Sequence, residues 1–192
     1  MILPLNPARK GEQLSDEEFY DFCQQNPHLR IERDEDGQII FEMPPRTKTS
    51  IKNLDIAIEV GLWNRQHKLG YVTDSNGGFT LPDSSVRVPD VAWVSRERWD
   101  ALSESDRDKF AKICPDFVIE LMSDPDERYT LPAKMEKYLR NGVRLAWVID
   151  PFEQQTTVYQ PGQEPQTVPF DQPLAGGDVL PGFALTLRTL LA

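Results

Sequence analysis

Two acidic residues, Asp90 and Glu120, stand where they could bind a divalent metal ion. Asp90 follows Pro89 and opens an apolar strand, and Glu120 stands near the end of the apolar segment 116–121. A single Glu in a buried strand needs a metal ion, another cation or a proton as its partner. Two carboxylates that project from neighbouring strand ends suit a hard ion such as Mg²⁺, which polarises a phosphoryl oxygen and activates water.

Lys134 is the basic residue that we expect to complete this group. It belongs to a predicted helix over 130–141, in which Pro132 lies in the first turn and Gly142 follows the end. At 100° per residue, Lys134 borders the apolar stripe of this helix, whereas Lys137 and Arg140 point away toward solvent. The apolar stripe consists of Leu131, Met135, Tyr138 and Leu139. Lys134 is therefore predicted to lean over the sheet toward Glu120.

Each of these residues also has an ordinary structural explanation. An Asp after Pro is often a turn former, a lone buried Glu is often half of an ion pair, and a helical Lys commonly extends along the surface. The acidic residues Asp55 and Glu59, four positions apart on an earlier helix, are ordinarily solvated or paired. The joint occurrence of Asp90, Glu120 and Lys134 favours a chemical role over three independent structural ones.

The elements that would position these residues indicate an α/β fold with a mixed central sheet flanked by helices. Helix, strands, helix and strand follow one another in that order. We predict a capped helix from Ser15 to Cys23 and a hairpin from Arg30 to Glu42 around Asp36-Gly37. Further helices are expected over 50–69, 96–112 and 130–141. Strands are expected near 78–81, 90–94, 116–121 and 145–149. Further β-structure is expected from 156 to the C-terminus.

The predicted helix from Ser50 to Leu69 is apolar on nearly every side, which is typical of a buried helix, and Gly70 is expected to close it. Glu59 has Ile56, Leu62 and Trp63 as its helical neighbours. A carboxylate in such company is costly to ionise without a cation, which makes Glu59 a further candidate for the site.

The composition fits one globular domain over 1–192 and argues against unaided nucleic-acid binding. The net charge is −10, whereas phosphate contacts need clustered Lys and Arg, so a local basic patch or a dimer would have to supply them. Cys23, Cys114, His28 and His67 are isolated, and we expect no zinc site; a nucleophilic Cys114 would need a His nearby. No signal peptide or membrane span is evident, so we expect a cytoplasmic protein without a membrane partner.

Several segments together resemble a known family. They are 88–94 (VPDVAWV), 115–121 (PDFVIEL), 134–138 (KMEKY), 141–143 (NGV), 147–151 (WVIDP) and 180–183 (LPGF). In this order they resemble the restriction-endonuclease family of Uma type, within the PD-(D/E)XK superfamily. The resemblance runs from about Phe19 to the C-terminus and therefore includes most of the chain.

The resemblance implies a metal-dependent endonuclease that hydrolyses DNA phosphodiester bonds. Mg²⁺, or alternatively Mn²⁺, would be bound by Asp90, Glu120 and the backbone carbonyl of Leu121, with no other cofactor. Lys134 would orient or help to deprotonate the attacking water. The superfamily pattern expects a Lys two residues after the second acid, but position 122 is Met, and Lys134 matches the position to which this branch moves the lysine.

The resemblance also implies a restriction-endonuclease-like core over about 50–151, with an N-terminal hairpin and C-terminal β additions. Some members use a Glu on the first helix, for which Glu59 is the candidate and Glu32 a weaker one. DNA and a second copy of the chain, in a homodimer, are the expected partners. The alternative is a catalytically silent nuclease fold that serves as a binding or regulatory module. Convergence of Asp90, Glu120 and Lys134 in a pocket would favour the enzyme.

Overall fold

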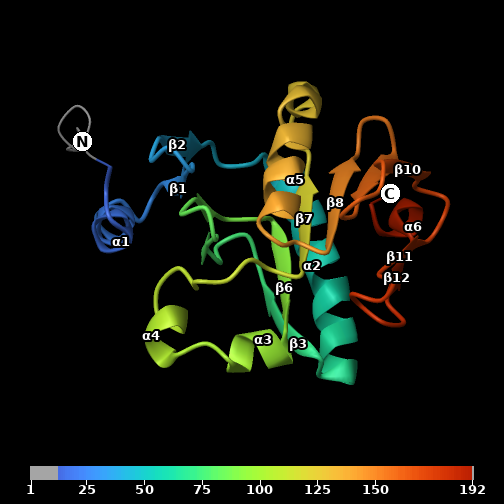
Figure 1. Ribbon diagram of the computed structural model, residues 1–192. Helices are drawn as coiled ribbons and strands as arrows, with labels where there is room; N and C mark the ends of the chain where they lie inside the picture. Colours follow the sequence, from blue (N-terminus) through green and yellow to red (C-terminus); the bar gives the residue numbers. More distant parts are fainter. Residues whose placement is uncertain (1–12, 192) are drawn as a thin grey trace.

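A mixed six-stranded sheet forms the centre of the computed structural model, which describes residues 13–191 (Figure 1). Its order is β10-β9-β8-β7-β6-β3, and only β7 and β8 run parallel. The strands are β3 (Gly70–Thr73), β6 (Val91–Ser95), β7 (Phe117–Leu121), β8 (Leu145–Asp150), β9 (Gln155–Tyr159) and β10 (Gln166–Pro169). The central strands read as continuous apolar runs because both of their faces are covered.

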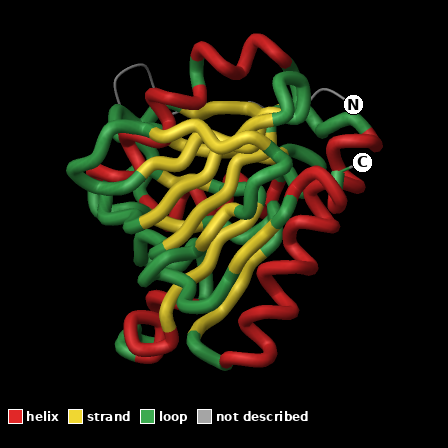
Figure 2. The backbone as a smooth tube through the Cα atoms, turned by 90° about the vertical axis from the view of Figure 1, so that its right-hand side faces the viewer, coloured by secondary structure: helices red, strands yellow, loops and turns green. Residues whose placement is uncertain are grey.

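Two helices cover opposite faces of this sheet, so the predicted α/β fold with a mixed central sheet flanked by helices is confirmed. Helix α2 (Thr47–His67) lies behind the sheet in Figure 1 and along its right side in Figure 2, and α5 (Leu131–Arg140) lies in front. Along β7, Ile119 and its alternate neighbours pack in the α2 core. Val118 packs in the α5 core, so Glu120, two residues later, faces α5.

A smaller four-stranded sheet carries the predicted hairpin. Its order is β2-β1-β5-β4, with strands β1 (Arg30–Arg33), β2 (Ile39–Glu42), β4 (Phe79–Thr80) and β5 (Val86–Arg87). Gly37 has φ +80° in the hairpin turn, as a glycine there allows. Helix α1 (Asp16–Gln25) begins with the predicted capping box between Ser15 and Glu18. These N-terminal elements lie together at the left of Figure 1.

Helix α2 differs from its prediction in burial and at both ends. It begins at Thr47, and it ends at His67 because Lys68 (φ +56°) takes the left-handed conformation, while Gly70 starts β3. Gly70 is needed for close packing, since a Cβ there would lie 2.2 Å from the carbonyl oxygen of Val94. The prediction of burial on every side was wrong. Only one side, with Ile56, faces the sheet, and Leu54 on the other side is 61% exposed.

The predicted helix over 96–112 is two short helices instead, α3 (Arg96–Asp100) and α4 (Glu104–Arg107). The chain breaks at Ser103 because its side chain accepts a hydrogen bond from the Asp106 N–H and so caps a new helix. The other elements are η1 (Pro125–Tyr129), β11 (Leu174–Ala175), β12 (Ala184–Leu185) and α6 (Leu187–Leu190). No helix within 13–191 is long and apolar enough to cross a membrane.

Candidate active site

The β6–β7 pairing brings Asp90 beside Glu120. Val91 lies opposite Ile119 in this antiparallel ladder, so its continuation by one residue sets Asp90 against Glu120. Asp90 immediately precedes β6, one residue before the strand begins. The backbone N–H of Leu121 donates a hydrogen bond to Asp90 Oδ2 at 2.9 Å. The Asp90 carboxylate is therefore fixed at the end of β7.

Lys134 makes the contact that its helical position predicts. Its Nζ lies 2.9 Å from Glu120 Oε1, and its side chain is only 17% exposed. The hydroxyl of Tyr138, one turn later on α5, donates a hydrogen bond to the same oxygen at 3.1 Å. The buried side of α5, with Leu131, Met135 and Tyr138, holds Lys134 over the sheet.

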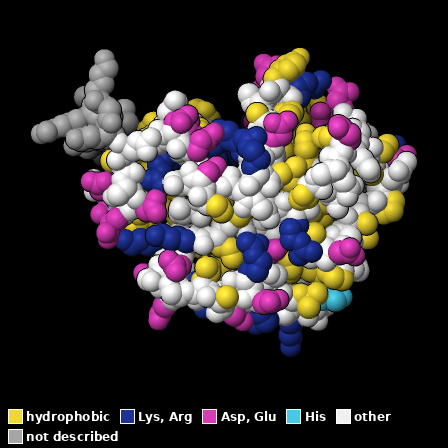
Figure 3. Space-filling view, in the orientation of Figure 1, with side chains coloured by type: hydrophobic (Ala, Val, Ile, Leu, Met, Phe, Trp, Pro, Cys, Tyr) yellow, Lys and Arg dark blue, Asp and Glu magenta, His cyan; other side chains and the backbone are white. Residues whose placement is uncertain are grey.

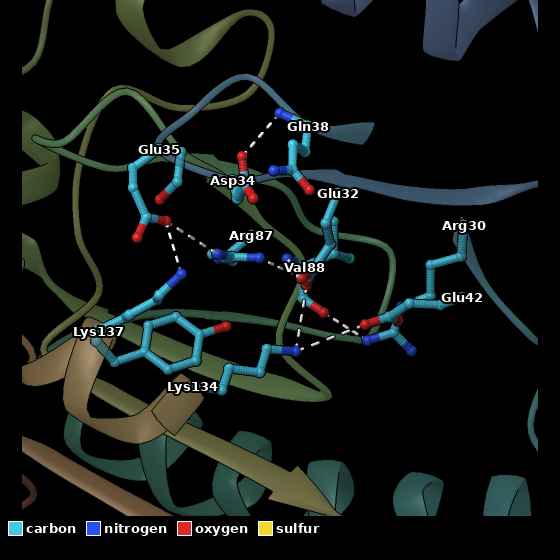
Figure 4. Close-up of polar contacts among 12 residues, drawn as sticks. Arg30, Glu32, Asp34, Glu35, Gln38, Glu42, Arg87, Val88, Lys134 and Lys137 are labelled. Atoms are coloured by element: carbon cyan, nitrogen blue, oxygen red, sulfur yellow. Dashed lines mark hydrogen bonds and ion pairs between the residues drawn. The ribbon is translucent and has the colours of Figure 1, made fainter. Parts of the chain in front are cut away.

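The N-terminal hairpin adds two carboxylates to the group. Lys134 Nζ lies 3.2 Å from Glu32 Oε1 and 3.6 Å from Glu42 Oε1. Figure 4 shows Lys134 directed at these two side chains, which come from β1 and β2. Glu32 is also held by Arg87, at 3.0 Å, and by the N–H of Val88, at 2.9 Å. The predicted N-terminal addition thus supplies part of the site.

Of the two further Glu candidates, the structure brings Glu32 to the group and leaves Glu59 outside it. Glu59 is half-buried on α2 and does not line the cleft described below. Its expected apolar surroundings are partly solvent, because its helical neighbour Leu62 lies on the exposed side of α2. Unlike Glu59, Asn53 of α2 does line the cleft. Its Oδ1 is buried without a hydrogen-bond partner within 13–191.

Arg30 is a site residue that the sequence reasoning missed. Its guanidinium lies 3.3 Å from Asp90 Oδ1 and 2.6 Å from Glu42 Oε2, and it donates a hydrogen bond to the carbonyl of Val88. The signal was present, because a hairpin centred on Asp36 pairs Arg30 with Glu42, as the ladder does. The contact with Asp90 depends on how the two sheets meet, which the hairpin pattern does not give.

These contacts form a chain of ion pairs across the site. It runs from Lys137 through Glu35, Arg87, Glu32, Lys134, Glu42 and Arg30 to Asp90, and Figure 4 shows most of it. Lys137 was predicted to point toward solvent, but its Nζ lies 2.8 Å from Glu35, which the hairpin turn places within reach. The hairpin therefore binds α5 through lysines on two successive turns.

A cleft of about 510 Å³ exposes this chemistry to ligands. Its lining includes Asp90, Glu120 and Leu121, which are the expected metal ligands, and Lys134, which is the expected lysine of the site. The other lining residues are Arg30, Glu42, Met43, Pro44, Pro45, Arg46, Thr49, Asn53, Ser123, Asp124, Glu127, Thr130 and Leu131. The cleft therefore lies between the hairpin, the start of α2, the end of β7 and the start of α5.

Burial and neighbouring charges shift the pKa values of Glu120 and Glu32 in opposite directions. Burial raises the pKa of Glu120 to about 8; Lys134 opposes this rise, and the nearby carboxylate of Asp90 reinforces it. Burial would also raise the pKa of Glu32, but Lys134 and Arg87 hold it below its ordinary value. Burial would lower the pKa of Lys134, yet Glu120 and Glu32 hold it well above the ordinary value. Lys134 is thus a stable cation.

The charges of the group leave one carboxylate in excess. Four carboxylates, of Glu32, Glu42, Asp90 and Glu120, face three cations, of Arg30, Arg87 and Lys134. A proton or an added cation balances the fourth carboxylate.

The donor atoms at the end of β7 have the chemistry that Mg²⁺ or Mn²⁺ binds. Within 13–191, no three or more Asp, Glu, His or Cys side chains form a group arranged for a metal ion. Asp90, Glu120 and the carbonyl of Leu121 offer two carboxylates and a backbone oxygen. Mg²⁺ commonly takes one or two protein carboxylates and keeps several waters, so this hard-oxygen set fits it.

A nucleophilic cysteine is not supported. Cys114 is buried against the carbonyl of Tyr138, and burial raises the pKa of its thiol to about 12. The thiol is therefore protonated at neutral pH and a poor nucleophile.

A comparison with known protein families identifies the family of this chain. The model of the family named Uma2, described as "Putative restriction endonuclease", matches residues 16–188. The chain belongs to the Uma2 family. This confirms the resemblance seen in the sequence, and the match includes both the hairpin and the C-terminal strands of the Uma2 chain.

A solved structure shares the fold of this Uma2 protein. It is described as a putative nuclease belonging to DUF820 from Anabaena variabilis, with a TM-score of 0.70 and 21% sequence identity. The alignment covers 88% of the present chain and 96% of the other. The likeness extends over nearly the whole fold and shows that the two proteins share it. No curated protein matches the sequence significantly.

Proposed function

We propose that this Uma2 protein is a metal-dependent endonuclease that hydrolyses DNA phosphodiester bonds in the cleft. The observation that carries the proposal is the convergence of Asp90, Glu120 and Lys134, which come from three separate elements, with Lys134 Nζ 2.9 Å from Glu120. Membership of a family described as "Putative restriction endonuclease" supports a nucleic-acid substrate.

Asp90, Glu120 and the carbonyl of Leu121 would hold Mg²⁺ or Mn²⁺. When bound, the ion supplies a positive charge that stabilises the phosphoryl oxygens and lowers the pKa of a bound water. The N–H of Leu121 keeps the Asp90 carboxylate in place, and Tyr138 and Lys134 fix Glu120. The protein therefore positions its donors before any substrate arrives.

Lys134 acts in this mechanism as a cation and hydrogen-bond donor. Its carboxylate neighbours keep its pKa well above the ordinary value, so it is not the base that takes a proton from water. It orients the attacking water and offsets negative charge as the water oxygen bonds to phosphorus and the bond to the leaving oxygen breaks; the attacking water gives up its proton to solvent, and the leaving oxygen takes one from solvent. Of the two roles that the resemblance implies for Lys134, the structure thus favours orientation over deprotonation.

One observation favours the second candidate, a silent nuclease fold used for binding or regulation. Both Asp90 oxygens are engaged, Oδ1 by Arg30 and Oδ2 by the N–H of Leu121. In that case the ion-pair chain is structural, and Arg30 balances Asp90 permanently.

The test is cleavage of supercoiled, linear and single-stranded DNA with Mg²⁺ or Mn²⁺. Asp90→Asn and Lys134→Gln are expected to lose cleavage at least a hundredfold while they remain folded. Glu59→Gln, a matched carboxylate change outside the cleft, is expected to cleave like the wild type. Equal activity in all three variants would contradict the site, and an inactive wild type that binds no metal in calorimetry would favour the silent module.

A further inference from the structure

A second hollow continues from the cleft along the start of α2. It has a volume of about 340 Å³ and shares Arg46, Thr49, Leu121 and Ser123 with the cleft. The rest of its lining is Thr47, Lys48, Lys52, Met122, Pro151 and Phe152. We call this region the basic hollow. Because both hollows include Leu121, a ligand that occupies the basic hollow lies beside the proposed metal ligands.

The basic hollow has a charge opposite to that of the whole chain. Three of its described lining residues are Lys or Arg and none is acidic, although the chain carries a net charge of −10. The cleft next to it has five acidic lining residues: Glu42, Asp90, Glu120, Asp124 and Glu127. On the face in Figure 3, basic side chains occur only in small groups among acidic ones. An acid-free hollow is therefore a local exception, of the kind that an anionic ligand needs.

The cations of the basic hollow are available to a ligand. Lys48 and Lys52 make no ion pair with any residue from 13 to 191. Arg46 lies 3.7 Å from Asp124, and both side chains are about half exposed or more, at 74% and 49%. Such an exposed pair contributes little and exchanges readily for a phosphate. In contrast, Lys134, Arg30 and Arg87 are committed to the ion-pair chain.

Phe152 adds an aromatic ring to the same hollow. Its side chain is 44% exposed, and its position follows from the turn after β8. The carboxylate of Asp150 accepts hydrogen bonds from the N–H groups of Phe152, at 2.8 Å, and Glu153, at 3.0 Å, and so fixes this turn. An exposed ring on a fixed turn, beside two lysines without an ion pair and an arginine in an exposed one, is a combination that suits single-stranded nucleic acid, in which bases stack on aromatic rings and phosphates contact Lys and Arg.

We propose that the basic hollow binds single-stranded DNA next to the phosphate in the cleft, with phosphates on Arg46, Lys48 and Lys52 and a base on Phe152. The position of the cleaved phosphate rests on the proposed function, whereas the binding itself does not. A single strand is required because a base within a duplex is already stacked on both faces. Stacking and phosphate contacts tolerate all four bases, so binding is weakly sequence-dependent.

The test is binding of a labelled oligo(dT) to the full chain in EDTA, measured by fluorescence anisotropy against salt. The variant Arg46→Gln/Lys48→Gln/Lys52→Gln is expected to weaken binding at least tenfold and to reduce the slope of log K against log salt by about 2, for three lost phosphate contacts. The matched control is Lys112→Gln/Arg140→Gln/Arg188→Gln, three side chains that are more than half exposed and lie outside both hollows. It should bind within about twofold of the wild type, because its net-charge change is the same but its site is different.

Substitutions of Phe152 test the contribution of base stacking to binding separately from that of charge. Phe152→Leu is expected to weaken oligo(dT) binding by roughly fivefold to a hundredfold, and Phe152→Trp should restore it. Circular dichroism and thermal unfolding check that each variant is folded. Equal losses in the two triple variants, tighter binding of a duplex than of oligo(dT), or an oligo(U) bound ten times more tightly than oligo(dT) would each overturn the proposal.

Asp90→Asn distinguishes this inference from the proposed function. In EDTA it should bind oligo(dT) at least as tightly as the wild type does, even though it is expected not to cleave. Oligo(dT) binding by a protein that never cleaves DNA would support the basic hollow and contradict the nuclease. Cleavage that is unaffected by the basic-hollow variant would support the nuclease and contradict the basic hollow.

Discussion

Replacement of Arg30 by Gln is expected to tighten the binding of Mn²⁺ or Mg²⁺ at Asp90. The guanidinium of Arg30 lies 3.3 Å from Asp90 Oδ1, so it holds the oxygen that the ion would use. A metal ion would have to displace this side chain or accept its positive charge nearby. Glutamine removes the charge and keeps a side chain of similar polarity in the cleft.

The size of the effect follows from the geometry of the pair. Two unit charges about 4 Å apart contribute about 4 kcal/mol at the effective dielectric constant of a protein surface. The Arg30 and Asp90 side chains are partly exposed, at 21% and 15%, so solvent screens their interaction and we take about a third of this value. That is about 1.4 kcal/mol, or a tenfold lower Kd for the metal ion.

Isothermal calorimetry with Mn²⁺, without DNA, measures this change directly. The matched control is Arg46→Gln, because Arg46 also lines the cleft but pairs with Asp124 instead of Asp90. Its Kd for Mn²⁺ should stay within about twofold of the wild-type value. An Arg30→Gln affinity equal to or weaker than that of the wild type would refute the reasoning, since Arg30 would then not compete with the metal ion.

Three further changes test the architecture around the site. Lys134→Met leaves Glu120, Glu32 and Glu42 without their shared cation and should lower the free energy of unfolding by about 3 kcal/mol, measured in urea; Lys134→Arg should recover at least half of this loss. In metal-free protein the pKa of Glu120 is raised from 4.5 to about 8, so its contribution to stability is full below pH 4.5 and is lost as the pH rises toward 8. Urea unfolding from pH 5 to 8 should show this decline, and Glu120→Gln should show less of it; equal pH dependence in both proteins would contradict the assignment. Gly70→Ala should lower the melting temperature by several degrees, because its Cβ would lie 2.2 Å from the Val94 carbonyl oxygen, and an unchanged value would contradict the close packing of β3 against β6.

The central sheet and the group at its edge could be predicted because their signals are local. The strand that contains Glu120 is apolar at its other positions, and the spacing of Lys134 from Leu131 and Tyr138 fixes its direction on α5. Pairing of the two strands then brings Asp90 beside Glu120 without further information. Patterns of this kind depend on periods of two and 3.6 residues, which the sequence displays directly.

The rest of the site depends on how two sheets meet, and no local pattern contains that. Glu59 is the stronger candidate from the sequence, because some members of the superfamily use a Glu on the first helix, and Glu32 is the weaker one. The small sheet nevertheless carries Glu32 to Lys134, while the cleft reaches only the start of α2, at Thr49 and Asn53, and leaves Glu59 outside. Arg30 was missed for the same reason. Burial of α2 was overestimated because an apolar sequence does not show which side another element covers.

The ion-pair chain between the hairpin and α5 links two equilibria, the docking of the small sheet and the occupancy of the cleft. A ligand that changes the charge at Asp90 alters the partner of Arg30, and Arg30 is bound through Glu42 to the same lysine that holds Glu32. By reciprocity, docking of the hairpin changes the affinity of the cleft by the same free energy by which ligand binding changes the docking of the hairpin. Backbone amides of β1 and β2 should therefore report on ligand binding through their rates of hydrogen exchange.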